Sequence, residues 1–583
     1  MIYLICALTS LALCFAAQQT VGIFQSESYK RPQLKLRLSE DPSPRQTMAK
    51  RLRLLALLQS AALVLAYAVI ALVSGSGTFV PDASASSWMS RFSTFAACAF
   101  GTVSLVALIV WFLRWRKQPA KKPMKYTTRI WRLNAALLVV LVALQLVLVL
   151  VASIIVYVLA YTVMNLFGSA SLFSQKTAGL LFYTMPVLAV VLMELVCAVH
   201  LPRLLALASI LVQPIETAVK NWYFNDARRK LAGYTDMVKI GITGSYGKTS
   251  AKVILATILS EKYKTMATPS SYNTPMGVTR VIREQLDASY QVFIAEMGAR
   301  HVGDIAEMCR LVAPRWGLLT SVGPQHLETF GSLDKVAKTK YELIDALPAD
   351  GMGFFPSDNE ICVSLYQNTQ KPKALFGIEG EGLYMTARDI EHGAEGGSFM
   401  LVGPDGATVR CRTKLLGRHN IQNILGCAAV AYALGLTLEE IARGVAKAEP
   451  VEHRLQLIPT TNGITVIDDA FNSNPSGARA ALDVLKSFPG RKIIITPGLV
   501  ELGETEAAEN EAFGRAMAGA VDVAILVARN GEAMRRGLVA AGYDEGNIFC
   551  VGSLSAATAA LGSISRSGDV VLFENDLPDH YEQ

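Results

Sequence analysis

Hydrophobic residues are unevenly spread along this chain, with long apolar runs before residue 215 and short ones after it. A membrane-spanning helix needs about 20 mostly apolar residues. Five runs have roughly this character, at 2–24, 54–74, 93–113, 133–165 and 179–200. The first is interrupted by "AQQT", but no Lys or Arg precedes it, so we expect a retained helix rather than a signal peptide. The pattern predicts a transmembrane domain of about five helices over residues 1–200.

Basic residues predict how these helices are oriented. Residues 25–53 and 114–132 each hold eight Lys or Arg, whereas 75–90 holds none. Because loops rich in Lys and Arg stay on the cytoplasmic side, we expect the amino terminus outside and everything after residue 201 in the cytoplasm, in a multi-pass protein of the cell membrane. Glu194 lies within the fifth run. It is either a functional intramembrane acid or a helix-end acid that reaches the interface, and both readings stay open.

From residue 237 the pattern changes to short β-rich runs that alternate with amphipathic helices. Residues 201–236 form a partly basic, amphipathic linker before it. The alternation indicates a parallel sheet covered by helices, with predicted strands at 237–244, 291–298, 315–323 and 351–359 and predicted helices at 248–263, 304–312 and 333–347. A Pro in "KAEPVEHR" marks a boundary, which gives a central domain at 237–449 and a second doubly wound domain at 450–583.

Charge and cysteine content exclude several classes of protein. The net charge of +7 comes with basic runs that flank apolar segments, which favours a membrane over a nucleic acid as partner. Nine cysteines occur without a CxxC pair, so neither a disulfide framework nor a zinc ribbon is expected.

The stretch "GITGSYGKTS" at 241–250 joins the first predicted strand to the first predicted helix. Gly244 and Gly247 allow backbone N–H groups to close on phosphates, and the helix N-terminus adds partial positive charge. Lys248 suits the terminal phosphates and Thr249 suits Mg²⁺. Ile242 stands where the usual G-x-x-x-x-G-K-[ST] loop has a glycine, so the spacing is the tighter T-G-x-x-G-K-T.

That tighter loop is typical of a family. From here to about residue 583 the chain resembles the Mur ligases, ATP-dependent amide ligases of peptidoglycan synthesis, most closely the branch that adds D-alanyl-D-alanine. The matching stretches are "GITGSYGKTS", "SYNTPMGV", "AEMGARHVGDIAEM", "HLETFGSLDKVAKTKYELI", "SDN", "GRHNIQN", "EHR", "VIDDAFNSNP" and "GLVELGE". The implied fold is an α-helical membrane domain followed by two α/β domains, a P-loop-type central domain and a Rossmann-like C-terminal domain.

The resemblance implies ATP and Mg²⁺ as cofactors and assigns roles to individual residues. The implied metal ligands are Thr249, Glu296, His326 and Lys340, the last as a carbamate. Lys248, His326 and Lys340 are the implied catalytic residues. Glu296 also ends one predicted strand and His326 follows another, at the sheet edge where ligands bind in such folds.

Further residues are implied to bind ATP or substrate. Those implied for ATP are Thr243, Gly244, Ser245, Gly247, Lys248, Thr249, Ser250, Asn359, His419, Asn420, Asn423, Arg454 and Asp469. Those implied for substrate are Asn273, Thr274, Asn472 and Asn474. The partners are then a cell-wall precursor, an amino acid or dipeptide, the lipid bilayer and other cell-wall enzymes, with no nucleic acid.

Two departures leave the substrate open. Membrane segments replace the small soluble domain that holds the UDP end of the precursor, and "LFENDLPDHYEQ" replaces a basic C-terminal stretch. We expect addition of D-Ala-D-Ala to UDP-MurNAc-tripeptide. The alternatives are a membrane-anchored ligase for a lipid-linked or poly-amino-acid acceptor, a nucleotide-gated transporter, and an inactive scaffold.

Overall fold

The computed structural model describes the carboxyl-terminal three quarters of the chain in most detail. Its described residues are 126–167, 172–270, 272–324, 327–393, 396–458, 460, 463–471, 474–500 and 502–575, with Val21, Gln25 and Ile109. Apart from Val21 and Ile109, the predicted spans at 2–24, 54–74 and 93–113 lie outside this set. Two compact units divide the chain, Met1–Val219 and Lys220–Gln583.

Two long helices occupy the places of the fourth and fifth predicted spans. They are α6, Thr128–Phe167, and α7, Leu172–Ala232, which includes the position of Glu194. Within the described residues, Thr128–Leu148 and Pro202–Ala232 are long and apolar enough to cross a membrane by length and composition alone. A domain of about five spans therefore stays a prediction.

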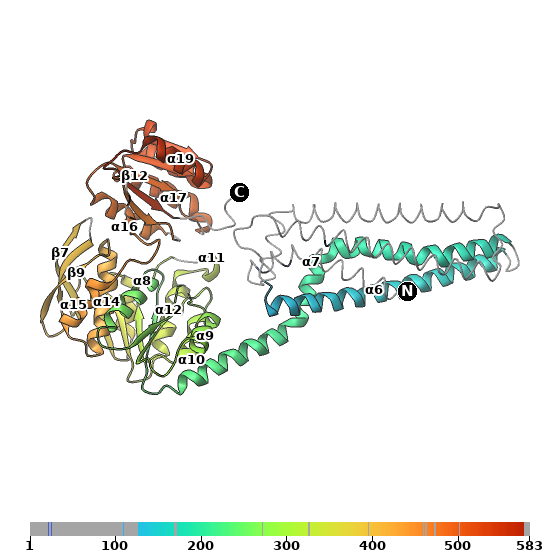
Figure 1. Ribbon diagram of the computed structural model, residues 1–583, viewed down its shortest axis with the longest axis horizontal. Helices are drawn as coiled ribbons and strands as arrows, with labels where there is room; N and C mark the ends of the chain where they lie inside the picture. Colours follow the sequence, from blue (N-terminus) through green and yellow to red (C-terminus); the bar gives the residue numbers. More distant parts are fainter. Residues whose placement is uncertain are drawn as a thin grey trace. The chain divides into compact units, whose positions relative to one another are not determined.

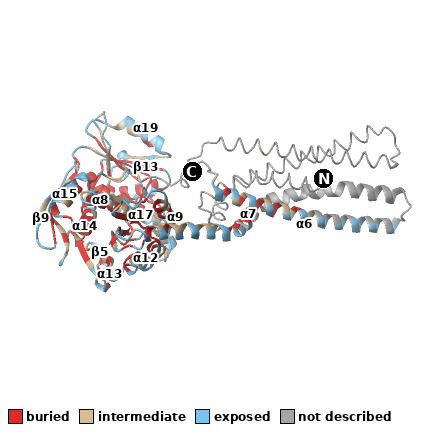
Figure 2. Ribbon diagram, turned by 60° about the horizontal axis from the view of Figure 1, so that its bottom comes forward, coloured by how far each residue is buried: buried red, intermediate tan, exposed pale blue. Residues whose placement is uncertain are grey.

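An ion pair and a set of buried apolar residues characterise the described part of the first unit. Arg132 at the start of α6 donates from Nε to Glu216 of α7 over 2.6 Å. The fully or nearly buried apolar residues of the two helices include Leu133, Leu137, Leu141, Leu205, Ala208 and Val212. Figure 2 shows exposed residues running along α6, and large apolar side chains are among them.

The end of α7 belongs to the second unit. Ala227 and Leu231 are buried in the same core cluster as α9, Pro275–Glu284. Asp226 accepts from Arg283 Nε over 2.7 Å, and Lys220 Nζ donates to Glu307 over 2.8 Å. The predicted linker is thus helical to residue 232, and its last turns are built into the central domain.

The central domain is built on a nine-stranded sheet. The strands, in spatial order, are β2 Thr265–Ala267, β3 Val292–Glu296, β1 Val238–Thr243, β4 Trp316–Leu319, β5 Met352–Pro356, β6 Lys373–Gly377, β7 Met385–Gly393, β8 Gly396–Val402 and β9 Thr408–Thr413. Neighbours are parallel from β2 to β7. The three-stranded antiparallel extension β7–β8–β9 was not anticipated from the sequence.

Helices cover both faces of this sheet. Ile240 and Ile242 of β1 pack with α8 Lys248–Leu259, α14 Arg418–Ala433 and α15 Leu438–Lys447. Phe293 and Ala295 of β3 face the other side, which holds α9, α10 Asp304–Val312, α12 Leu333–Asp345 and α13 Glu360–Asn368. The short α11 is Leu327–Phe330. Figure 1 shows α9, α10 and α12 on the opposite side of the strands from α14 and α15.

The C-terminal domain is a second sheet with six strands. Its order is β10 Gln456–Ile458, β11 Thr465–Asp469, β15 Val570–Glu574, β12 Lys492–Thr496, β13 Val523–Val527 and β14 Ile548–Val551. All pairs are parallel except β10–β11. One hydrophobic core cluster contains residues of α16 Pro475–Lys486, α17 Glu506–Met517 and α18 Gly531–Ala540. A second cluster contains residues of α19 Leu554–Ile564. Single turns of 3₁₀ helix are η1 Gly503–Thr505, η2 Ala528–Asn530 and η3 Glu545–Asn547.

The strands and helices predicted for the central domain are confirmed, with ends that differ by a few residues. Both sheets keep the parallel core that strand–helix alternation predicts. The buried cores of the two domains stand out in Figure 2.

Close packing of α15 on α8 gives a stability test. A Cβ on Gly444 would lie 2.6 Å from the backbone Cα of Ile258, whereas one on Gly562 in α19 meets nothing within 4 Å. Gly444→Ala should therefore lower the free energy of unfolding by about 1–3 kcal/mol through overpacking. Gly562→Ala should raise it by up to about 1 kcal/mol through helix propensity. Thermal unfolding of the full chain measures both, and changes of the same sign would contradict this packing.

Candidate active site

The loop between β1 and α8 is held by the residues that follow β4. A Cβ on Gly244 would lie 2.0 Å from Thr320 Oγ1 and 2.9 Å from the backbone N of Ser321, so only glycine fits there. The backbone N of Ser245 donates to Ser321 O over 2.8 Å, and its hydroxyl donates to Gly323 O over 3.0 Å. The loop is thereby fixed to the sheet before any ligand binds.

The N-terminus of α8 has the geometry of an anion site. Gly247 is its N-cap, with a left-handed φ of 78°, and free N–H groups at a helix start attract phosphate. Lys248 Nζ lies over the loop and donates to the carbonyls of Gly244 and Ser245 over 2.8 and 2.9 Å. Burial lowers the pKa of Lys248 to about 8, with Glu296 acting against this and Arg454 adding to it. Most of the amine is therefore charged at neutral pH.

Glu296 ends β3 beside this loop, and its carboxylate gathers three side chains. Oε1 accepts from Thr249 Oγ1 over 3.2 Å and from Asn273 Nδ2 over 3.0 Å. Oε2 accepts from Lys252 Nζ over 3.0 Å. The structure thus brings together three of the predicted residues, Thr249, Glu296 and Asn273. It adds Lys252, which the sequence analysis missed although it lies one helical turn after Lys248.

The oxygen atoms of Glu296 and Thr249 suit a hard divalent cation such as Mg²⁺. Within the part of the chain that the structure describes, no group of three or more His, Cys, Asp or Glu residues forms a metal cluster. His326 lies outside the described residues. Glu296 and Thr249 are the predicted metal ligands that the structure joins by a hydrogen bond.

Lys340 is buried on α12, and its surroundings oppose a positive charge. Burial lowers the pKa of Lys340 to about 7, the charge of Lys248 acts in the same direction, and Asp304 and Glu342 oppose it. Glu342 in turn accepts from the backbone N of Gly303 and of Ala306, over 2.7 and 2.9 Å, at the start of α10. A substantial fraction of the Lys340 amine is neutral near pH 7, the form that reacts with carbon dioxide.

Several residues predicted to bind ATP hold the fold near α14. Asn420 donates to Leu416 O over 2.8 Å and accepts from Asn423 over 3.3 Å. Asn423 Oδ1 would lie 2.6 Å from a Cβ on Gly247, so this helix abuts the phosphate loop. Asn359 is the N-cap of α13 and donates to Val322 O over 2.8 Å. These residues contribute to the local architecture whether or not they touch a base.

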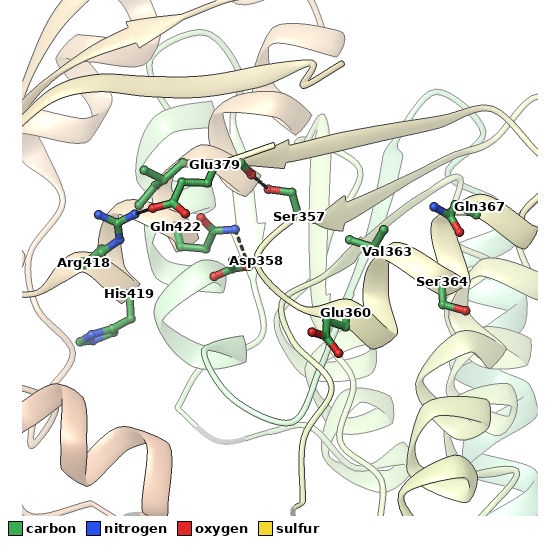
Figure 3. Close-up of a pocket in the computed structure, with 11 residues that line it drawn as sticks. Ser357, Asp358, Glu360, Val363, Ser364, Gln367, Glu379, Arg418, His419 and Gln422 are labelled. Carbon is green, nitrogen blue, oxygen red and sulfur yellow. Dashed lines mark hydrogen bonds and ion pairs between the residues drawn. The ribbon is translucent and has the colours of Figure 1, made fainter. Parts of the chain in front are cut away.

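A cleft of about 670 Å³ opens beside them. Its lining residues are Ser357, Asp358, Glu360, Val363, Ser364, Gln367, Ile378, Glu379, Arg418, His419 and Gln422. Figure 3 shows Gln422 pointing at Asp358, with a hydrogen bond of 2.8 Å, and Arg418 paired with Glu379. Among the residues predicted to bind ATP, His419 lines this cleft.

Predicted residues of the C-terminal domain lie near the ends of its strands. Arg454 stacks on Phe471 with 4.7 Å between the guanidinium carbon and the ring centroid. Burial lowers the pKa of Arg454, against the charges of Glu296 and Asp469, so the guanidinium lies within the field of the Glu296 carboxylate. Burial raises the pKa of Asp469, which pairs in register with Glu574.

Two of the predicted substrate residues are helix caps. Thr274 accepts from Gly277 N over 3.3 Å at the start of α9, and Asn474 accepts from Gly477 N over 3.0 Å at the start of α16. Asn472 lies outside the described residues. Their roles toward a substrate stay predictions.

Comparison with known proteins identifies the family. The family model for the Mur ligase middle domain matches residues 242–431, and that for the Mur ligase glutamate ligase domain matches 453–574. Over 357 residues the chain is 34% identical to the UDP-N-acetylmuramoyl-tripeptide--D-alanyl-D-alanine ligase of Mycobacterium bovis, covering 57% of this chain and 69% of that protein. The chain belongs to the Mur ligase family.

Two further comparisons show how much of the chain is similar to known Mur ligases. The Escherichia coli enzyme of the same name is 33% identical over 297 residues, a match that covers 51% of this chain and 65% of that enzyme, just under two thirds. A crystal structure of MurF from Acinetobacter baumannii superposes with a TM-score of 0.56 at 26% identity, covering 61% of this chain and 77% of that one. The Mur ligase fold thus accounts for the second compact unit.

Lys248 offers a direct test of the Mur ligase phosphate loop. Lys248→Met removes the cation that lies over the loop and should lower ATP turnover at least about 100-fold, because the charge on the transferred phosphoryl group loses a stabilising partner. The matched control is Lys262→Met. The exposed amine of Lys262 donates to a backbone carbonyl, Gly435 O, so this variant should leave ATP turnover within about twofold. ADP release measures both, and full turnover in Lys248→Met would exclude this loop as the nucleotide site.

Proposed function

We propose that this Mur ligase is an ADP-forming amide ligase of peptidoglycan precursor synthesis, which adds D-Ala-D-Ala to UDP-MurNAc-tripeptide at the cytoplasmic face of the cell membrane. The observation that carries the proposal is the meeting of Lys248, Thr249 and Glu296 at one sheet edge. The names of the M. bovis and E. coli relatives support the substrate pair.

The reaction has two steps. A carboxylate oxygen of the acceptor attacks the γ-phosphorus of ATP, which forms an acyl phosphate and releases ADP. The amine of the dipeptide then attacks the acyl carbon, and phosphate leaves with the former carboxylate oxygen while the amine loses a proton. Both steps place negative charge on phosphoryl or acyl oxygens, so preorganised donors and cations lower the barriers.

Residues of this chain supply those donors and cations. The N–H groups at the start of α8 and the ammonium of Lys248 bind the β- and γ-phosphates. Arg454, whose guanidinium lies over the ring of Phe471, faces the transferred phosphoryl group from the C-terminal domain. Asn273 and Thr274, on the segment tied to Glu296, position the acceptor. His419 and its cleft take the adenine side.

Glu296 and Thr249 would hold Mg²⁺ through oxygen, and the ion would shield the phosphate charge. Lys340, when carbamylated, would become an oxygen ligand instead of a cation. Its burial and its lowered pKa favour the neutral amine that this modification requires.

A membrane-bound acceptor is the second candidate. The continuity of α7 favours it, because one helix includes the apolar segment after Pro202 and also packs into the ligase core at Ala227 and Leu231. A ligase tied in this way to an apolar helix is suited to a lipid-linked intermediate.

The assay uses the full chain with ATP, Mg²⁺ and UDP-MurNAc-tripeptide, with and without D-Ala-D-Ala. We expect ADP release that depends on the dipeptide, together with an amide product in which the masses of the two substrates are joined less one water. Turnover with only a lipid-linked acceptor would establish the second candidate. Absence of amide product with either acceptor would contradict both.

A further inference from the structure

Lys252 is a buried cation beside the nucleotide loop that the proposed chemistry does not use. It lies on α8 one turn beyond Lys248, and its side chain is 3% exposed. Its ammonium donates to Glu296 Oε2 over 3.0 Å and to the backbone carbonyl of Ser270 over 2.5 Å. Burying an ammonium and a carboxylate together is costly unless both are well bonded, so the arrangement calls for an explanation.

The two oxygens of Glu296 have different partners. Lys252 occupies Oε2, while Thr249 and Asn273 donate to Oε1. With one oxygen fixed by a buried cation, the carboxylate cannot turn freely about its terminal bond. Oε1 is therefore held on the side of Thr249, the hydroxyl next to the phosphate-loop lysine.

The second partner of Lys252 is a strained turn. Ser270 has a left-handed φ of 45°, a conformation that costs a non-glycine residue about 1–3 kcal/mol and persists where the surroundings enforce it. Its carbonyl accepts from Lys252. On the far side of this turn, Asn273 O accepts from Gly298 N over 2.8 Å. The segment that leads to Thr274 is thus tied to α8 through Lys252 and to the end of β3 through Asn273.

We propose that Lys252 is a positioning residue. It fixes the Glu296 carboxylate so that Oε1 is offered to a cation shared with the nucleotide, and it ties the segment before α9 to the phosphate-loop helix. This inference rests on the proposed function, since it concerns the orientation of the carboxylate that would hold Mg²⁺. Lys252 acts through Glu296 and Ser270 and touches no reacting atom.

The test compares the affinity of the full chain for ADP with and without Mg²⁺, which needs no acceptor. In the parent protein, Mg²⁺ should tighten ADP binding because a cation held by Glu296 would shield the phosphate charge. Lys252→Met should shrink that enhancement at least fivefold, because the carboxylate can now turn away from Thr249. In the ligation assay the same variant should lower kcat at saturating Mg²⁺ at least tenfold.

A matched control separates positioning from general stability. Lys371 donates to three carbonyls at the end of α12, those of Ile344, Asp345 and Leu347, so Lys371→Met should lower the melting temperature without changing the Mg²⁺ enhancement. If Lys252→Met does not fold, Lys252→Gln keeps a donor without the charge, and the same loss of enhancement is expected.

The outcomes distinguish this inference from the proposed function. An unchanged Mg²⁺ enhancement in the folded Lys252 variant overturns the positioning role and leaves the ligase proposal intact. A loss that follows the melting temperature in the Lys252 and Lys371 variants alike also overturns it. A parent protein whose ADP affinity does not respond to Mg²⁺ overturns both.

Discussion

The site depends on supplying hydrogen-bond partners to the carboxylate of Glu296 at the buried edge of a parallel sheet. A charge with 1% of its side chain exposed is stable only with bonded partners. Lys252 and Thr249 come from α8, and Asn273 comes from the segment before α9. Meeting this requirement fixes the phosphate-loop helix, the end of β3 and the segment that leads to α9 relative to one another. The need to balance one buried charge thus assembles the nucleotide side and the predicted substrate side of the site together.

The regular elements of both α/β domains followed from local pattern. Short apolar runs between amphipathic helices predict buried parallel strands, and strands such as β1 and β3 have that character. The antiparallel extension was not predicted because β7 and β9 are each about half exposed, and in β7 a buried start gives way to mostly exposed positions. A half-solvated strand carries a weak hydrophobic signal, and its partner strand decides whether it forms.

Among the site residues, too, some could be predicted from the sequence and others could not. The phosphate loop could be predicted because its glycines, lysine and threonine lie close together in the sequence. Lys252 was not, because a lysine on a helix is usually solvated, and its partner Glu296 lies 44 positions away. Cap residues such as Asn359 and Asn474 show the converse difficulty. Their place in the family motif suggests ligand binding, while their side chains already serve the starts of α13 and α16.

The chain also joins a ligase to an apolar helix without a break in α7. Its last turns contribute Ala227 and Leu231 to the central core, so this end of the helix is a structural part of the ligase unit. The two Mur ligase family models match residues 242–431 and 453–574, which lie after the end of α7.

The central claim is that ATP activates an acceptor carboxylate as an acyl phosphate. Labelling both carboxylate oxygens of the acceptor with ¹⁸O and analysing the released phosphate by mass spectrometry tests it most directly. If the acyl phosphate forms, the released phosphate carries one labelled oxygen for each amide bond formed. Amide formation with unlabelled phosphate would contradict it, because the carboxylate oxygen would then never have been bonded to phosphorus.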